Sequence, residues 1–561
     1  MKKGKFVKRL AALLLVCLMV ASVAACGKSG TDNDQTTNQN TNQNNAADSN
    51  SGDSSSGQNN QSNQSNTDSN SSGNQTTTDN SPAPSGPART LNVAASADSG
   101  TLHPLGVTGG YFSVLYSIYE PLWDVKSDGT WVWVLAKSID RISDIQNTLH
   151  LQEGVKFSNG NAFTAEDVIF TMEQNRENPQ FALNVKAIDF DKTNIIDDYT
   201  IDLWYTEFNA AQEVGMVQML IMDKESYDEI SLTLNPIGTG PYVVTDYIVN
   251  SHLALQARND YWGGPIAIQN ILYKCINEEM QIINALETGD VDMAGVPLSE
   301  VDFVESLGYV IDDNNAGMNY AAWYSMLPGT PLETKEARYA VSYSIDRQAV
   351  SDILLEGRAS ITDAPISHYT VDFEQRWRNM HDTYIIGYNP AKARELAEES
   401  GLVGKTLRLI TNGASSNNTL AEIIQGGLLE IGVNVDIISF DQASFFGMMM
   451  DPSNFDIALF TPSAPSMMAV DILAMYPTFI SLGWTGPERD EYGALSMGAL
   501  TTADEATRKE LLYEALKIFV DVDPWYGICE LVAARARVPE LVGVEYFISG
   551  NVYFQNVSFV N

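Results

Sequence analysis

The sequence predicts an α/β fold, and three observations support this prediction. In the second half of the chain, apolar runs of strand length alternate with longer amphipathic segments of helical length. This alternation is typical of βαβ units around a mainly parallel sheet. Glycines and prolines punctuate the segments at their ends. About 470 residues after residue 89 have a globular composition, which is too much chain for one core, so we expect at least two domains.

The chain begins like an exported lipoprotein. Five basic residues lie within the first nine positions, and an uncharged apolar stretch spans residues 10–20. That stretch is typical of a secretory signal and is too short to span a membrane permanently. Residues 22–26 read Ser-Val-Ala-Ala-Cys, which resembles the lipobox of bacterial lipoproteins. We therefore predict a signal peptide over residues 1–25 and a lipid on Cys26, with an N-terminal anchor helix and an incidental cysteine as the alternative.

Residues 26–89 form a low-complexity segment. Asn, Gln, Ser, Thr, Asp and Gly dominate it, and large apolar side chains are absent. Such a segment cannot bury enough apolar surface to offset its conformational entropy, so we expect a disordered linker. A flexible coil of ~60 residues reaches roughly 40–45 Å, which would carry a folded domain clear of a membrane surface.

Net charge and cysteine content limit the partners and the redox chemistry. The formal net charge is −38 at pH 7, which excludes nucleic acid as a partner and favours solubility outside the cell. Two of the four cysteines, Cys275 and Cys529, lie beyond the lipobox. We favour two buried free thiols, and a disulfide between them stays open because the sequence does not give their separation.

The first half of the chain shows short strands and two marked helices. Thr164 should cap a helix whose acidic first turn faces the positive end of the helix dipole. A later helix should bury Met280, Ile283 and Leu286 on one face and end at Gly289. The other expected elements are a helical stretch at 111–119 and strands at 91–94, 131–135, 148–151, 242–244, 253–256, 271–275 and 291–293.

Helix signals become more regular in the second half. A helix over 390–400 should follow Asn389 as its N-cap, and a helix over 420–431 should stop at a glycine. Thr502 and Glu505 have the spacing of a capping box for a last long helix through residue 519. Strands are expected at 406–410, 433–438 and 455–460, the last one after a methionine-rich helix.

Several ordered motifs resemble one family of binding proteins. The strongest lies within residues 151–170, as Leu-Gln-Glu-Gly-Val-Lys-Phe and then Phe-Thr-Ala-Glu-Asp-Val-Ile-Phe. The further motifs are Gly238-Thr239-Gly240-Pro241-Tyr242, Arg258-Asn259-Asp260-Tyr261-Trp262-Gly263-Gly264, Gly289-Asp290-Val291-Asp292, Glu336-Ala337-Arg338, Ser344-Ile345-Asp346-Arg347 and Leu429-Glu430-Ile431-Gly432-Val433. From residue 91 onward the chain resembles the family 5 extracellular solute-binding proteins of ABC importers, in the branch for oligopeptides, dipeptides and nickel complexes.

The resemblance implies a two-lobed periplasmic-binding-protein-like fold with an extra inserted N-terminal subdomain. Lobe I would comprise residues 91–119, 236–318 and 531–561, the inserted subdomain residues 120–235, and lobe II residues 319–530. The lobes would close on a solute by a hinge motion, and the closed form would dock on a membrane permease. A monomer without a cofactor is expected.

One loop departs from the family pattern. Peptide-binding members hold the amino terminus of the ligand on an aspartate that follows a tryptophan, in the loop after a strand. Here residues 461–468 contain neither residue, and the nearest downstream acid is Asp471. Either the ligand is not a peptide with a free amino terminus, or another acid such as Glu530 takes this role. We expect a peptide or peptide-like solute, with a metal chelate or an oligosaccharide as the alternative.

Aromatic, methionine and hydroxyl side chains near this loop and the crossover segments are the candidate lining, because ligand sites are mostly apolar with a few polar anchors. The candidates are Tyr111, Trp323, Tyr324, Thr461, Ser463, Met467, Trp484 and Glu530. Ordinary packing in the core or at the rim is the competing interpretation for each of them. Three consecutive methionines at 448–450 indicate a helix face in the core more than a soft-metal site.

No catalytic or metal-binding pattern accompanies these motifs. The five histidines are His103, His150, His252, His368 and His381. No two of them are four positions apart, and none lies beside a cysteine pair. No Gly-x-Ser-x-Gly elbow, phosphate loop or dinucleotide fingerprint occurs. The sequence therefore predicts a lipid-anchored extracytoplasmic binding protein. A tethered extracellular enzyme and a ligand sensor are the rival classes.

Overall fold

The computed structural model describes residues 89–106, 114–126, 129–463, 466–479, 482–548 and 550–560. These residues belong to one compact unit. The expected signal peptide, Cys26, the linker and Tyr111 lie outside the described residues. Within the described ranges, no helix combines the length and the apolar character needed to cross a membrane.

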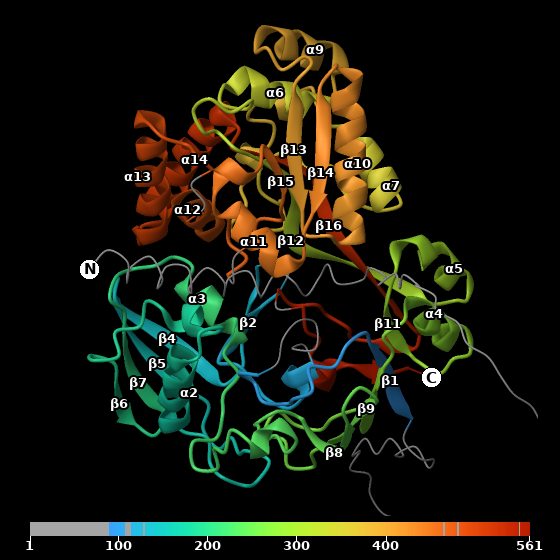
Figure 1. The fold of residues 1–561 in the computed structure, drawn as a ribbon. Helices are drawn as coiled ribbons and strands as arrows, with labels where there is room; N and C mark the ends of the chain where they lie inside the picture. Colours follow the sequence, from blue (N-terminus) through green and yellow to red (C-terminus); the bar gives the residue numbers. More distant parts are fainter. Residues whose placement is uncertain are drawn as a thin grey trace, which may run out of the picture. The chain divides into compact units, whose positions relative to one another are not determined.

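A ten-stranded mixed sheet runs through this unit (Figure 1). Its strands lie in the order β14 (Asn434–Ser439), β13 (Thr406–Thr411), β15 (Ile457–Leu459), β12 (Val310–Tyr324), β16 (Trp525–Arg537), β11 (Met293–Val296), β1 (Thr90–Ala95), β10 (Asn270–Cys275), β9 (His252–Ala257) and β8 (Tyr242–Ile248). β13 is parallel to β14 and β15, and β1 is parallel to β10 and β11.

The remaining neighbours in this sheet are antiparallel. A mainly parallel sheet was the expectation, and it holds only within the two parallel groups. The β8–β9 connection is short enough for a hairpin, which only antiparallel strands can use, and β12 and β16 run in opposite directions between the groups.

β12 and β16 join the two parallel groups. They pair with each other along most of their length, while one end of β16 pairs with β11 and one end of β12 pairs with β15. The register shifts between Asn315 and Asn319, and Gly317 lies inside this irregularity with a φ of 64°. Glycine adopts this left-handed conformation without a steric cost, and a bulge bends a strand locally. We call residues 315–319 the β12 bulge.

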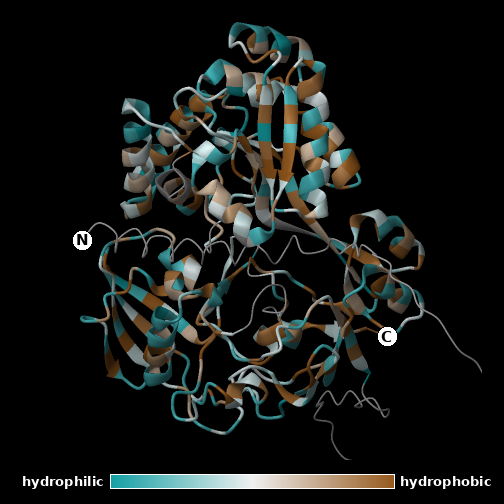
Figure 2. Cartoon of the chain, viewed as in Figure 1, coloured by the Kyte–Doolittle hydropathy of each residue, from teal (hydrophilic) through white to brown (hydrophobic). Residues whose placement is uncertain are grey.

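Helices cover the β13–β14–β15 group. α10 (Ser415–Glu430) connects β13 to β14 and packs on both strands, and α6 (Lys335–Ser344) packs on α9 (Pro390–Glu399) (Figure 1). Figure 2 shows apolar residues along β13 and β14, which matches the full burial of Leu407 and Leu409. Asn389 caps α9 as predicted, since its side chain accepts the N–H of Lys392.

The position of the last long helix differs from the prediction. α14 (Glu505–Val522) begins after Asp504, whose carboxylate accepts the N–H of Thr507 at 2.8 Å. Thr502 is therefore not the cap. Asp is as good an N-cap as Thr, and here it lies directly before the first helical residue.

The buried face of α4 (Glu279–Glu287) also differs from the prediction. Its buried residues are Ile282, Ile283 and Leu286, whereas Met280 is 59% exposed. A spacing of three drifts around a helix of 3.6 residues per turn, so Met280 lies outside the stripe that Ile283 and Leu286 share. Gly289 follows the helix with a φ of 73°, the left-handed conformation typical of a glycine that ends a helix, as predicted.

A separate four-stranded sheet lies within residues 136–204. Its order is β4 (Ala136–Ser143), β5 (Gln146–Leu151), β7 (Thr200–Trp204) and β6 (Asn194–Asp197), and all neighbours are antiparallel. α2 (Ala165–Glu177) begins at a capping box between Thr164 and Asp167, so Thr164 is confirmed as its N-cap. The boundaries of the inserted subdomain, 120–235, stay a prediction.

Most of the other local predictions are confirmed. The expected strands at 91–94, 253–256, 271–275, 406–410 and 433–438 are present to within one residue, whereas the strand expected at 148–151 begins two residues earlier and the one expected at 242–244 runs four residues further. The strand at 131–135 is shorter, as β3 (Trp131–Trp133), and the one at 455–460 reduces to β15. The strand expected at 291–293 is displaced, because β11 begins only at Met293. Residues 114–117 form only a short 3-10 turn in place of the expected helix. Cys275 and Cys529 are free thiols, as favoured, but only Cys529 is buried and Cys275 is half-buried.

A buried arginine explains why three of the resemblance motifs occur together. The Arg258 side chain is almost fully buried, and a Cβ on Gly238 would lie 2.1 Å from the carbonyl oxygen of Ile118. Arg258 donates at 3.1–3.4 Å to the carbonyl oxygens of Gly238, Thr239, Gly240, Lys156 and Phe157 and to the carboxylate of Asp260. The Arg258 side chain therefore links the three motifs by hydrogen bonds.

Candidate functional site

Two loops meet at the β12 bulge. They are residues 367–373 and the post-β15 loop, of which the structure describes residues 461–463 and 466–468. The N–H of Val371 donates to the carbonyl oxygen of Met467 at 3.2 Å. A Cβ built on Gly317 would lie 3.0 Å from Cε of Met467 and 3.3 Å from the carbonyl oxygen of Tyr369. The bulge and the two loops thus form one junction.

The Glu530 carboxylate lies at this junction and is fully buried. β16 carries it, opposite Asn319 on β12. Ser367 donates its hydroxyl to one carboxylate oxygen, and the other accepts the backbone N–H of His368 at 3.2 Å. Nδ1 of the same histidine lies 2.7 Å from that second oxygen. Three donors from the 367–373 loop therefore occupy the carboxylate, which leaves little capacity for a ligand ammonium group.

A second, half-buried acid fixes the post-β15 loop. The carboxylate of Asp372 accepts the N–H groups of Ala469 at 2.6 Å and Val470 at 3.0 Å, which begin α12 (Ala469–Phe479). Burial raises the pKa of Asp372, and the two N–H donors act in the opposite direction. Asp372 thus provides, from a distant segment, the carboxylate that an N-terminal cap would supply.

Asp471, the acid nearest the loop, is also engaged. It is buried, and its carboxylate accepts the hydroxyl of Ser466 at 2.9 Å. The ammonium group of Lys186, which lies outside the two loops, is 3.7 Å from the second carboxylate oxygen of Asp471. Neither Glu530 nor Asp471 is therefore a free carboxylate.

Trp323 lies close to the start of the post-β15 loop. Its ring stacks on Trp525 with centroids 4.3 Å apart, and its Nε1 donates to the carbonyl oxygen of Phe460 at 3.0 Å. Thr461 and Ser463 follow Phe460, the first half-buried and the second buried. The structure thus brings Trp323, Thr461, Ser463, Met467 and Glu530 to the junction.

Two other predicted residues lie in packed cores. Tyr324 points to the opposite face of β12 from Trp323 and shares a hydrogen bond of 2.9 Å with the Ser342 hydroxyl, among fully buried side chains. Trp484 packs on Tyr492 with ring centroids 5.2 Å apart. Their surroundings favour the competing interpretation of ordinary packing.

Sequence reasoning missed Ser367, His368 and Lys186 as site residues. Ser367 and His368 bond to a carboxylate more than 160 positions away, and Lys186 faces an acid almost 300 positions away. No local pattern marks such partners. Only the missing aspartate of the post-β15 loop pointed to the acids near it.

The family of bacterial extracellular solute-binding proteins, family 5 Middle, has a sequence model that matches residues 130–478. This chain belongs to that family. The match covers more than half of the sequence, and it includes both loops of the junction. The two-lobed α/β fold expected from the resemblance is confirmed, and the family acts extracytoplasmically in ABC importers.

Two curated relatives of this family 5 protein illustrate the similarity. A probable ABC transporter periplasmic-binding protein, SapA of Escherichia coli (strain K12), is 24% identical over 461 residues, covering 73% of this chain and 80% of the relative. The oligopeptide-binding protein OppA of Bacillus subtilis (strain 168) is 23% identical over 530 residues, covering 84% and 92%. Both relatives are binding proteins by name.

A solved structure supports the fold of the family 5 chain. The ABC transporter substrate-binding protein CtaP of Listeria monocytogenes superposes with a TM-score of 0.73 at 21% identity, covering 84% of this chain and 100% of CtaP. At this identity the likeness concerns the fold alone.

Acidic side chains of this family 5 protein also line cavities of the described residues. Among the described residues, no group of three or more His, Cys, Asp or Glu side chains is placed to hold a metal ion. A surface hollow of about 690 Å³ lies on the four-stranded sheet, away from the junction, with His150 paired to Asp140 on its wall. A much smaller cavity of about 20 Å³ lies beside Lys186 and Asp471.

Proposed function

We propose that this family 5 protein captures a peptide or peptide-like solute at the junction and delivers it to an ABC permease. The observation that carries the proposal is the convergence of two loops on the β12 bulge. β12 and β16 are the strands that join the two parallel groups of the ten-stranded sheet. A bulged strand pair is a natural hinge, and a loop pair beside it changes its spacing when the hinge closes. Members of the family bind solutes, and OppA is named for oligopeptides.

The charges at the junction favour a solute whose end at the post-β15 loop is uncharged. An ammonium group would have to displace Ser367 or His368 from Glu530, or Lys186 from Asp471. Breaking such buried hydrogen-bonded groups is costly, because each partner is left without a donor or an acceptor. Of the two alternatives, a ligand without a free amino terminus therefore has more support.

A calorimetric panel tests the proposed function. Di- to octapeptides, each prepared with a free and with an acetylated amino terminus, are titrated into the purified mature protein. Heat is expected from at least one series, with the acetylated members binding more tightly. No heat from any peptide would reject the peptide class and favour a metal chelate or an oligosaccharide. Tighter binding of the free amines would reject only the preference for an uncharged end.

We further propose that a lipid on Cys26 and the 26–89 linker tether this monomeric, non-enzymatic protein to the outer face of the cell membrane. Cys26→Ala is expected to release the protein into the medium or to stall processing of the precursor, because no lipid can be attached. Membrane fractionation and mass spectrometry of the intact protein check this outcome. Ser22→Ala keeps the cysteine and serves as the control; equal membrane retention of both variants would contradict the anchor.

A sensor role is the second candidate function. The fold and the anchor would be the same, so deletion phenotypes separate the two roles. A transport protein is expected to limit uptake of its solute, whereas a sensor would change gene expression with uptake intact.

A further inference from the structure

A contact between two distant segments lies next to the junction. One segment is residues 182–218, which includes α3 (Gln212–Gly215) and short 3-10 turns at Ala182–Val185 and Met216–Gln218. The other is residues 466–475 of the post-β15 loop and α12, together with Leu500 at the end of α13 (Pro487–Thr501). We call this contact the clasp. It joins the predicted inserted subdomain to the predicted lobe II.

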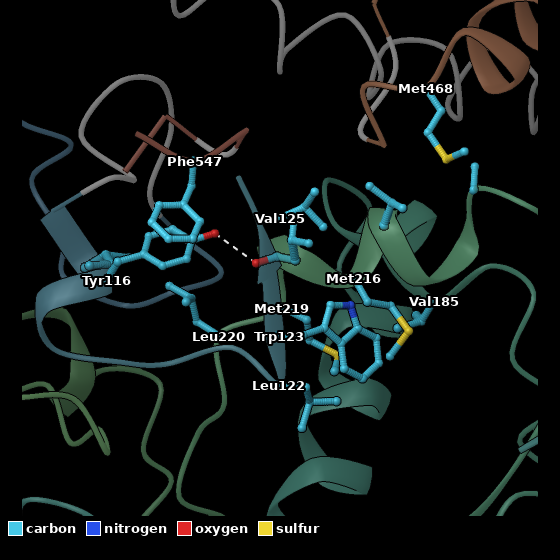
Figure 3. Close-up of a cluster of buried hydrophobic side chains, with 14 of the residues drawn as sticks. Tyr116, Leu122, Trp123, Val125, Val185, Met216, Met219, Leu220, Met468 and Phe547 are labelled. Atoms are coloured by element: carbon cyan, nitrogen blue, oxygen red, sulfur yellow. Dashed lines mark hydrogen bonds between the residues drawn. The ribbon is translucent and has the colours of Figure 1, made fainter. Parts of the chain in front are cut away.

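Met468 supplies the apolar part of the clasp. Its side chain is 8% exposed and belongs to the same hydrophobic cluster as Val185 and Met216. Figure 3 draws these three residues in one group of buried side chains, with Met468 reaching the group from the α12 side. Burying a methionine side chain strongly favours the contact, and its flexible thioether fills irregular gaps.

Lys186 supplies the charged part. Its ammonium lies 3.7 Å from the Asp471 carboxylate, with Lys186 40% and Asp471 7% exposed. A half-exposed pair of this kind contributes less than the burial of Met468, because water and salt screen it. We therefore expect Met468 to dominate the stability of the clasp and Lys186 to tune it.

Backbone pairing and close packing complete the contact. The N–H of Ala210 donates to the carbonyl oxygen of Leu500 at 2.9 Å. The cavity between the segments has only about 20 Å³, lined by residues of both, including Lys186, Gln212 and Ser466. That is room for about one water molecule. The two segments are therefore in direct contact.

We propose that the clasp positions the post-β15 loop, so that Met468 and Lys186 are positioning residues for solute retention. Met468 directly follows Met467, the loop residue that contacts the β12 bulge, and Ser466 links the same loop to Asp471. Opening the clasp frees the loop that borders the junction. The link to retention rests on the proposed function, whereas the clasp itself does not.

Hydrogen exchange of the solute-free mature protein tests the clasp. Met468→Ala is expected to speed the exchange of amides within residues 182–218 by at least about tenfold, because truncation removes buried apolar surface from the cluster that spans the two segments. Lys186→Glu should produce a smaller increase, about threefold, that disappears in 1 M salt. Any panel peptide that binds should also leave the Met468→Ala variant about tenfold faster.

Matched variants separate the clasp from general loosening. Leu428→Ala truncates a fully buried residue of α10 in a different hydrophobic cluster, and it should speed exchange in α10 while leaving residues 182–218 unchanged. Lys335→Glu disrupts the exposed Lys335–Asp521 pair, which lies outside both segments, and should also leave the clasp intact. Unchanged exchange of residues 182–218 in Met468→Ala would overturn the proposal. Faster exchange with an unchanged peptide dissociation rate would overturn the positioning role alone.

Discussion

Arg258→Met is expected to lower the free energy of unfolding by about 3–5 kcal/mol, the usual cost of removing one partner from a buried charged network. The guanidinium donates to five carbonyl oxygens and to Asp260, and methionine can replace its volume but none of its donors. The carbonyl oxygens of Gly238 and Gly240 would then be left without this partner in a buried region.

Urea unfolding of the purified mature protein, followed by tryptophan fluorescence, measures this change. Arg489→Met is the matched control, because Arg489 is half-buried and forms an ion pair with its exposed neighbour Asp490 at 3.6 Å. It should change stability by no more than about 0.5 kcal/mol. Equal stabilities of the two variants would show that the Arg258 network does not hold the three motifs together.

We expect Glu120→Gln to lose less stability than the wild type as the pH rises. Burial raises the pKa of Glu120 from 4.5 to about 7, while hydrogen bonds from Tyr261 and Trp262 act in the opposite direction. The folded state therefore holds this proton more tightly than the unfolded state. The stability is fully present below pH 4.5 and is lost as the pH rises through 7, by about 3 kcal/mol for this one group.

Denaturant unfolding at pH 5 and pH 8 tests the sign and the size of this effect. The wild type should lose more stability between the two values than Glu120→Gln does. Burial also raises the pKa of Asp523 to about 7, so Asp523→Asn provides a second variant. It should remove the part of the pH dependence of stability that comes from Asp523. Identical pH dependence of wild type and Glu120→Gln would contradict a protonated Glu120 in the folded state.

Local signals predicted the elements well where the cause lies within a few residues. The capping box of Thr164 and Asp167 depends on residues three apart, and it is present as expected. The failures have local causes too. Asp504 competes with Thr502 for the same helix end, and Met280 satisfies a spacing of three without lying on the buried stripe. The mixed character of the sheet was missed because the pairing of β12 with β16 depends on segments some 200 residues apart.

The candidate site was predicted less completely than the fold. Glu530 and Met467 were predicted from residue type and from the departing loop, and the structure places both at the junction. Ser367, His368 and Lys186 were not predicted, because each acts through a partner far along the chain. Trp323 and Tyr324 were predicted together, but alternation along the strand places them in two different hydrophobic clusters.

The place of β16 in the sheet has a consequence for biosynthesis. This strand, only a few dozen residues from the end of the chain, lies in the middle of the ten-stranded sheet, between β12 and β11. A chain is made from its amino end, so the two parallel groups cannot be joined through β16 until almost the whole sequence has been synthesised. Pairing over such long separations is also slow. The ten-stranded sheet is therefore completed only after residues 525–537 have been synthesised.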